Sequence, residues 1–327
     1  MKVEGYHFTR GMNNNIINIV DDIIQIHSYD DIGAGAIRKE KLDFIQSGEL
    51  SFILNKKDFN ILRNFNEMDI SMKDETIIVQ SGKTKLKFQN QTDVKEYQPD
   101  LTDPINLNLP IDILTAASEF VGDSDRSKGI LVTPDCVAAS DGKILYRFTL
   151  KTNLDHKISV PPEILKILDK ETNYEVKLCN RMIVMLGAGE VVYSSLYEGF
   201  VDSIERITMD GEGRLKLKKE ELIKHLNLAS NFSSAVSVDI EGKKMIIESV
   251  VAEGIVQSYS GEIEVTTNIK KFRGGALVKQ LLKVLRQAGD EPELKIGNKS
   301  YEISDGNLEA LALGFTVQGA EPMEVTA

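Results

Sequence analysis

Apolar and polar residues follow a repeating pattern along this chain. Residues 51–62 and 157–168 place their apolar side chains at the same relative positions, 106 residues apart. The same offset continues without a gap through residues 70–79 and 176–185. Strict alternation of apolar and polar residues predicts half-buried strands, and a brief helical period between them predicts a short helix. The order strand, helix, strand, strand therefore occurs twice. The matched pairs are Phe52 with Ile158, Leu54 with Val160, Phe59 with Leu165, Ile61 with Ile167 and Leu62 with Leu168.

A third, looser copy follows in residues 263–313, with additional residues 267–273 before its helix. The opening half of the unit also repeats, because residues 107–120 and 215–232 each predict a strand that runs into an amphipathic helix. Hairpins are predicted at 130–147 and 236–249, with turns at Asp141-Gly142 and Glu241-Gly242, since glycine tolerates the positive φ of a tight turn. The first copy has a hairpin at 16–27, but residues 1–15 are too few and too polar to predict a leading helix.

The pattern therefore predicts an α+β fold of three tandem domains, at residues 1–104, 105–208 and 209–327. A length of 327 residues is too great for one ordinary core. Apolar residues make up 42% and charged residues 27% of the chain, which is typical of a globular protein. Cys136 and Cys179 are far apart and form no metal-binding spacing, no segment is apolar enough to span a membrane, and residues 1–15 have no signal-peptide core. We expect a cytoplasmic protein with reduced thiols and no membrane partner.

Basic residues concentrate in one segment although the net charge is −11. Residues 270–286 contain no acidic side chain, and at helical spacing Lys279, Lys283 and Arg286 lie opposite the apolar face formed by Leu277, Leu281, Val284 and Leu285. Net charge does not exclude a polyanionic partner, because one surface can be basic while the rest is acidic. The candidate residues that face DNA are Lys166, Lys170, Lys224, Lys279, Lys283 and Arg286.

Two interpretations of these lysines stay open. On a single helix, they are ordinary solvated side chains; recurrence in equivalent helices instead favours a surface that holds duplex DNA by its phosphates, without reading bases. Catalytic patterns are missing from the sequence: the GxG at Gly33 and the GxG at Gly187 are interpreted as turns, the four histidines are scattered, and no Ser-His-Asp, P-loop or HExxH spacing occurs. We expect no enzyme activity, no cofactor and no metal, with a weak cation site in the polar loop 121–125 as the one alternative.

Three local phrases resemble one family, the bacterial DNA polymerase III beta subunits, or sliding clamps, with their phage and mobile-element relatives. Residues 137–145 (VAASDGKIL) are similar to the family's hairpin, residues 158–165 (ISVPPEIL) to its strand-to-helix entry, and residues 197–202 (YEGFVD) to the run before its third domain. The resemblance implies three clamp domains with sheets outside and helices lining a hole. It also implies a homodimer that closes head to tail into a ring of six domains around double-stranded DNA.

The same resemblance implies a processivity factor that tethers a DNA polymerase and is served by a clamp loader. It implies a groove between domains two and three for a short apolar peptide of the partner, at Ser140, Asp141, Gly142, Leu145, Leu311, Ala312, Leu313 and Phe315. This chain departs from the family pattern at Lys143-Ile144, at Val201 and at Leu313-Gly314-Phe315, and it continues to Ala327 beyond the family's usual end. The alternatives are a ring-forming structural protein, for example of a phage particle, and an unrecognised enzyme. The sequence leaves open the polymerase, the loader and the host.

Overall fold

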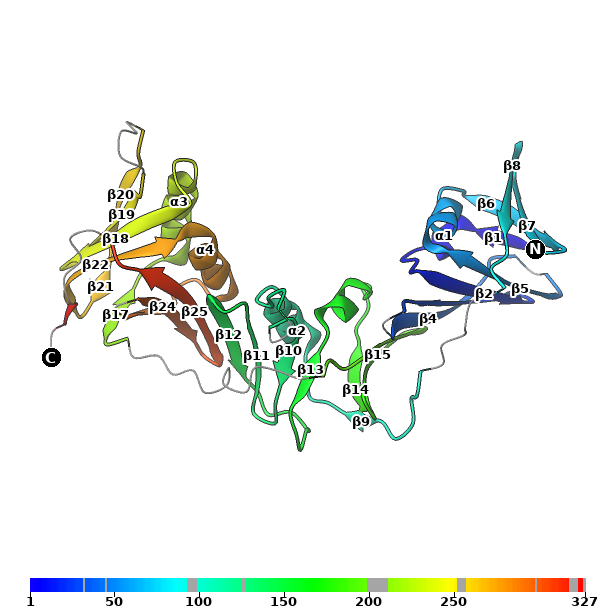
Figure 1. Cartoon of the computed structure of the whole chain (residues 1–327), viewed down its shortest axis with the longest axis horizontal. Coiled ribbons are helices and arrows are strands. Elements are labelled where there is room, and N and C mark those ends of the chain that lie inside the picture. The colour runs from blue at the N-terminus through cyan, green and yellow to red at the C-terminus, as the bar shows by residue number, and fades with distance from the viewer. Residues whose placement is uncertain are drawn as a thin grey trace. The chain divides into compact units, whose positions relative to one another are not determined.

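The structure is a computed structural model that describes residues 1–31, 33–44, 46–92, 99–124, 127–198, 211–251, 257–297, 299–317 and 323–325. Contacts divide the chain into two compact units (Figure 1). Unit 1 comprises residues 1–111 and 160–197, and unit 2 comprises residues 112–159 and 198–327. The phrase at residues 197–202 lies largely outside the described residues. So does Asp125 of the polar loop.

Unit 1 is built from antiparallel strands with short helices. The strands pair in the orders β1-β6-β7-β8 and β5-β2-β3-β4-β16-β15-β14-β9. Its elements are β1 (Lys2–Glu4), η1 (Gly5–His7), β2 (Asn14–Val20), β3 (Ile23–Tyr29), β4 (Ala34–Lys41), β5 (Glu49–Asn55), α1 (Lys56–Leu62), β6 (Glu67–Lys73), β7 (Thr76–Ser81), β8 (Thr84–Gln89), β9 (Ile105–Asn106), η2 (Pro162–Lys166), β14 (Glu175–Cys179), β15 (Met182–Gly187) and β16 (Glu190–Ser195).

Unit 2 repeats the same plan with longer helices. Its strands pair in the order β13-β10-β11-β12-β25-β22-β18-β19-β20, and β17, β23 and β24 extend the sheet beside β25. Its elements are α2 (Ile111–Ser118), β10 (Ile130–Val132), β11 (Cys136–Ser140), β12 (Ile144–Thr149), β13 (Ile158–Val160), β17 (Gly213–Lys216), α3 (Lys219–Ser230), β18 (Ala235–Glu241), β19 (Lys244–Ser249), β20 (Ser260–Glu264), β21 (Thr266–Thr267), β22 (Ile269–Leu277), α4 (Val278–Gln287), β23 (Glu293–Gly297), β24 (Ser300–Asp305), β25 (Leu308–Phe315) and β26 (Glu324–Val325).

The order of elements confirms the α+β repeat. Each repeat contributes two four-stranded half-sheets: β5-β2-β3-β4 with β1-β6-β7-β8, β13-β10-β11-β12 with β9-β14-β15-β16, and β22-β18-β19-β20 with β17-β23-β24-β25. One helix precedes the central hairpin (η1, α2, α3), and another follows the fifth strand (α1, η2, α4). In the first repeat the leading element is only the three-residue turn η1. The predicted hairpins are all present, with positive φ at Asp21, Gly142 and Gly242.

Two details differ from the prediction. The short helix expected between residues 157 and 168 is a 3-10 helix over Pro162–Lys166 that follows an extended Pro161, and not an α-helix. Residues 267–273 do not form an insertion before the third helix. Residues from Ile269 onward belong to β22, a long strand that pairs with β18 and runs directly into α4.

Alternating side chains of the strands supply the core. In unit 1 a cluster of fully buried residues unites the two half-sheets of the first repeat through α1, where Phe59 meets Phe8 edge-on at 5.5 Å between ring centroids. In unit 2 the inward residues of β18 and β19 are buried together with Leu222 and Leu226 of α3. Burial of each such side chain contributes about 1.5–3 kcal/mol to the stability of the fold. The alternation of apolar residues along each strand therefore determines which face of the sheet is covered.

Successive repeats are joined edge to edge through strands, in contacts that we call joints. In unit 1, β4 pairs with β16, which places Arg38 opposite Glu190 and Gly35 opposite Tyr193. In unit 2, β12 pairs with β25, which places Arg147 opposite Glu309. Both joints thus place an arginine opposite a glutamate, but the two pairs are not equivalent, because Glu190 ends its hairpin opposite Gly187 as Leu308 ends its hairpin opposite Asp305, so Glu309 corresponds to Val191. A Cβ on Gly35 would overlap the Tyr193 hydroxyl, so the first joint requires glycine there.

Buried polar groups complete the first joint. The Tyr193 hydroxyl contacts His27 Nε2 at 2.6 Å, and burial lowers the pKa of His27 to about 4. Arg10 Nη2 lies 3.0 Å from Glu190, and the same carboxylate accepts from Tyr174. Burial, and after it the charge of Arg10, lowers the pKa of Arg38. The joint is thus a continuous sheet with buried polar groups rather than a flexible linker.

Candidate nucleic-acid and partner interfaces

Helix α4 presents the basic stripe that the sequence predicts. It buries Val278, Leu281, Leu282, Val284 and Leu285 against the sheet, while Lys279 and Arg286 are exposed and Lys283 is half-buried. The helix starts at Val278, so Leu277 is its extended N-cap and not a member of the buried helical face. The apolar side therefore anchors the helix, and the opposite side is free to carry positive charge.

Lys283 is held in place by an aromatic ring. Its Nζ lies 5.3 Å from the centroid of Phe120, which follows α2, and Gln287 Nε2 donates to Glu119 at 3.2 Å. Such a cation–π contact contributes about 0.5–1 kcal/mol at an exposed site. In unit 2, helices α2, α4 and α3 lie next to one another on the same side of the strands (Figure 1). The stripe of α4 is therefore part of a helical surface.

The other predicted basic residues lie in different surroundings. Lys166 ends η2 and Lys170 follows it in unit 1, and both are exposed. Lys224 is exposed on α3, but Glu220 and Glu221 are exposed on the same helix, so α3 carries little net charge. Lys224 is thus not part of a basic stripe comparable with that of α4.

Three basic residues were missed by the sequence analysis. Lys56 and Lys57 open α1 and Arg63 caps its end, and all three are exposed. Because α1, η2 and α4 occupy the same position in the three repeats, these residues extend the pattern of Lys166, Lys170 and the α4 stripe. The 106-residue offset aligns α1 with η2, so the repeat itself contained the signal. Basic side chains gather on the helix that follows the fifth strand in each repeat.

The residues predicted for a partner groove come together in unit 2. Asp141 Oδ1 accepts from the amides of Lys143 at 2.8 Å and Ile144 at 2.9 Å, which fixes the turn between β11 and β12. Ser140 Oγ donates to the Ile144 carbonyl at 2.7 Å and accepts from the Gly142 amide at 3.0 Å. The Leu313 amide donates to the Lys143 carbonyl at 2.9 Å, so the turn lies beside the end of β25.

Only some of these residues reach the surface. Leu145 and Leu311 are opposite each other and belong to a buried cluster, and Ala312 is also buried. Leu313 is 45% exposed, and Phe315 is half-buried with its ring against Gly275. Any contact with a partner peptide at this place would therefore be made by Leu313, Phe315 and the turn, above a floor of Leu145 and Leu311, because Ala312 points to the opposite face of the sheet.

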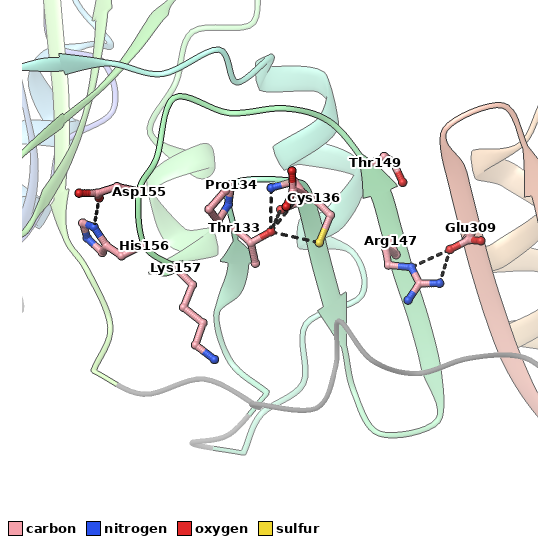
Figure 2. A pocket seen from close by; sticks show the side chains of 10 residues that line it. Thr133, Pro134, Cys136, Arg147, Thr149, Asp155, His156, Lys157 and Glu309 are labelled. Carbon is pink, nitrogen blue, oxygen red and sulfur yellow. Dashed lines mark hydrogen bonds and ion pairs between the residues drawn. The ribbon is translucent and has the colours of Figure 1, made fainter.

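A cavity of about 620 Å³ opens elsewhere in unit 2 (Figure 2). Its charged and polar side chains are engaged with one another: Arg147 Nε donates to Glu309 at 2.6 Å, His156 contacts Asp155, and Thr133 Oγ1 donates to the sulfur of Cys136 at 3.4 Å. Figure 2 shows the Arg147–Glu309 pair at the edge of this cavity. The cavity thus borders the second joint and is lined by mutually neutralised charges.

Across the described ranges, no three His, Cys, Asp or Glu side chains gather as a metal site requires. In that same part of the chain, no helix combines the length and apolar character needed to cross a bilayer.

Comparison with known proteins identifies the fold. The sequence matches no protein-family model and has no significant match to a curated protein. Solved structures do match over nearly the whole chain. The Helicobacter pylori beta clamp bound to a DNA ligase peptide matches with a TM-score of 0.83 and 16% identity, over 97% of this chain and 100% of that one. The DNA polymerase III subunit beta of Pseudomonas aeruginosa matches with a TM-score of 0.80 and 12% identity, over 97% and 100%. This chain therefore has the fold of the DNA polymerase III beta sliding clamps.

Proposed function

We propose that this chain is a DNA sliding clamp, a non-catalytic processivity factor that encircles duplex DNA without sequence specificity and tethers a replicative DNA polymerase. The observation that carries the proposal is the clamp fold, found over 97% of the chain, together with basic residues on the helix after each fifth strand. We also propose that the three repeats act as clamp domains with boundaries near 1–104, 105–208 and 209–327, and that the protein works in the cytoplasm with a clamp loader.

The proposed DNA surface consists of side chains suited to phosphates. Lysine and arginine on long, mobile stems neutralise phosphates and release counterions, which gives binding that depends on salt and not on sequence. In this proposal the helices of all repeats face the hole, and Lys279, Lys283 and Arg286 of α4 are the densest group. Lys166 and Lys170 contribute from the second repeat, Lys56, Lys57 and Arg63 from the first, and Lys224 contributes least.

Ring closure follows from the way the repeats are joined. The fourth strand of the first repeat (β4) pairs with the last strand of the second (β16), and β12 pairs in the same way with β25. This leaves one unused fourth strand, β20, and one unused last strand, β8, which are edges of their sheets. If β20 of one chain pairs with β8 of another, the same joint forms twice more and closes a homodimer of six domains.

The register of the first joint also brings opposite charges together. Gly261 in β20 corresponds to Arg38, because it pairs with Ile247 as Arg38 pairs with Ile26. The 106-residue offset makes Thr84 the counterpart of Glu190. In the proposed contact Gly261 would lie opposite Thr84, and Glu262 would lie opposite Lys83. This intermolecular ion pair would lie one position beyond the place that the Arg38–Glu190 pair holds in the first joint.

An apolar patch next to β20 supports the same contact. Leu228 and Phe232 of the α3 end and Val250 after β19 are large apolar residues with more than a third of their surface exposed. Phe232 stacks on Tyr259, at 6.5 Å between centroids, and Tyr259 would lie opposite Leu86 in the proposed register. Exposed apolar residues grouped at a sheet edge are typical of a subunit interface.

A charge swap tests the closure. Lys83→Glu and Glu262→Lys should each place like charges opposite one another and shift the protein from dimer to monomer, whereas the double variant should restore the dimer, as measured by sedimentation. A natural chain that stays monomeric at high concentration would contradict the ring.

Partner tethering is proposed at the turn Ser140–Gly142 and the end of β25. Leu145 and Leu311 form the floor there, and Leu313 and Phe315 are available to hold a short apolar peptide. The shared clamp fold supports this place, and titration of a labelled partner peptide against a Leu313→Asp variant would measure it. Loss of affinity is expected, because an unpaired carboxylate would replace an apolar contact.

Topology of the DNA discriminates a clamp from a structural ring. Protein loaded onto nicked circular plasmid should be retained on gel filtration and should be lost after the plasmid is cut once, because a ring slides off a free end. A structural ring without a DNA role would show no difference between circular and linear DNA. Equal retention on both forms would therefore reject the proposed function.

A further inference from the structure

The C-terminal segment returns to the sheet of the third repeat. In β26, Val325 lies opposite Ile269 and Glu324 lies opposite Lys271 of β22, in antiparallel pairing. The other edge of β22 is occupied by β18 from Lys271 to Leu277. The end of β25 covers only Gly275 and Ala276 on the edge that β26 uses. The segment 323–325 therefore covers a stretch of strand edge that the rest of the fold leaves open.

A methionine anchors this segment in a notch. Gly213 of β17 is buried, and a Cβ at that position would lie 2.6 Å from Met323 Sδ and 2.8 Å from Ile269 Cδ1. Met323 therefore packs directly against the backbone of Gly213, beside Ile269. Methionine is unbranched and polarizable, which suits a narrow apolar gap of this kind. The missing side chain at Gly213 creates the space that Met323 fills.

The notch is constructed without help from the C-terminal segment. Asn268 accepts from the Arg214 amide at 2.7 Å and donates from Nδ2 to the Glu212 carbonyl at 3.2 Å. Thr267 Oγ1 donates to the Arg214 carbonyl at 2.7 Å. These bonds fasten the start of β22 to β17 on both sides of Gly213, so the walls of the notch are preorganised for whatever occupies it.

The occupant, by contrast, is held by few interactions. β26 has two residues, Glu324 is exposed, and Met323 and Val325 are only half-buried. Such a short strand at a sheet edge lies at the low end of local stability. Lys270 and Lys271 are exposed on β22 beside it, and their charges match an acidic residue at the position of Glu324.

We propose that the Gly213 notch and the adjoining edge of β22 are a peptide-binding site, kept occupied in cis by Met323–Val325 until a partner protein displaces it. The partner supplies an extended segment with an unbranched apolar residue for the notch, followed by an acidic residue opposite Lys271 and a β-branched residue opposite Ile269. The added strand forms main-chain hydrogen bonds with β22, and the notch selects the side chain. The site uses none of the residues of the groove at Leu311–Phe315 and does not rest on the clamp function.

The test releases the segment within the full chain and offers the same sequence in trans. Met323→Asp places a carboxylate in the apolar notch and should free β22. A fluorescent peptide with the sequence of residues 320–327 should then bind this variant about tenfold more tightly than the natural chain, if the segment occupies the site about nine-tenths of the time. Hydrogen exchange of residues 268–273 should become faster in the variant and slow again when the peptide is added.

Two controls decide the outcome. A peptide with aspartate in place of the methionine should not bind the Met323→Asp chain. Adding Gly213→Ala to that chain should remove most of the gained affinity, because the new methyl group fills the notch, and melting temperatures would show that both variants are folded. Equal binding by the natural and Met323→Asp chains, or equal binding of the two peptides, would overturn the proposal and leave the segment as a simple edge cover.

Discussion

Neutralising the basic stripe of α4 is the most direct test of the proposed DNA surface. We would replace Lys279, Lys283 and Arg286 together by alanine. Lys279 and Arg286 are exposed, and Lys283 loses only its contact with Phe120, about 0.5–1 kcal/mol, so the helix should remain folded on its buried face. Circular dichroism and the melting temperature would verify this before any binding measurement.

The expected effect is on the salt dependence of binding. On B-DNA the slope of log K against log salt is about −0.9 for each phosphate neutralised. Losing three contacts per chain should flatten the slope by about 2.7, or by about 5 in a ring of two chains. Between 50 and 200 mM salt, the natural protein should therefore lose about 10³-fold more affinity than the variant, as measured by fluorescence anisotropy with a short duplex.

A matched control separates local contact from net charge. Alanine at Lys216, Lys243 and Arg214 removes the same three charges from exposed positions of unit 2, on β17 and in the turn between β18 and β19. This variant should keep the natural slope. An unchanged slope for the α4 variant, or an equal change for both variants, would refute the role given to α4.

Three further predictions concern stability. Phe59→Ala should lower the free energy of unfolding of unit 1 by about 3–5 kcal/mol, measured by chemical denaturation, because it opens a cavity in a fully buried cluster. The hydrogen bond from His7 holds the pKa of the Glu40 carboxyl below its usual value, so Glu40 stabilises the fold fully above its unfolded-state pKa; the difference in stability between the natural chain and Glu40→Gln should shrink as pH falls below that value and level off below the lower folded-state pKa. Glu309→Ala leaves Arg147 without its carboxylate and should destabilise the second joint by about 1–3 kcal/mol, seen as faster hydrogen exchange in β25.

The sequence predicted the elements best where side-chain alternation alone determines them. The hairpin of β18 and β19 and its turn at Gly242 follow from period-two burial and one glycine. The sequence predicted the short helix after β13 but not its 3-10 type, because side-chain spacing does not distinguish a short 3-10 helix from one turn of α-helix. The prediction that residues 267–273 are an insertion was wrong, because most of them belong to β22. A long strand at the centre of a sheet has no strict alternation that distinguishes it from an insertion.

The candidate surfaces were predictable only in part. Helical spacing predicted the stripe on α4, because five buried residues define its opposite face. Lys56 and Lys57 were missed because α1 is short and carries Asp58, so its charge does not stand out in sequence. Edge pairing between repeats was not predictable, since burial patterns determine which face of a strand is covered but not which strand lies beside it.

The fit of side chains across the joints bears on how the chain avoids mispairing while it folds. Each molecule has several edges of similar shape, so a fourth strand has more than one last strand to choose from. With the last strands of the two hairpins aligned at their turns, Gly35 accommodates the Tyr193 ring, whereas the corresponding pair in the second joint is Leu145 with Leu311. Exchanging partners would force Leu145 against Tyr193 and leave Gly35 facing Leu311. The size of the facing side chains thus selects which strand edges pair with each other. Substitutions at Gly35 should therefore produce chains with mispaired or intermolecularly paired edges before they lower the melting temperature.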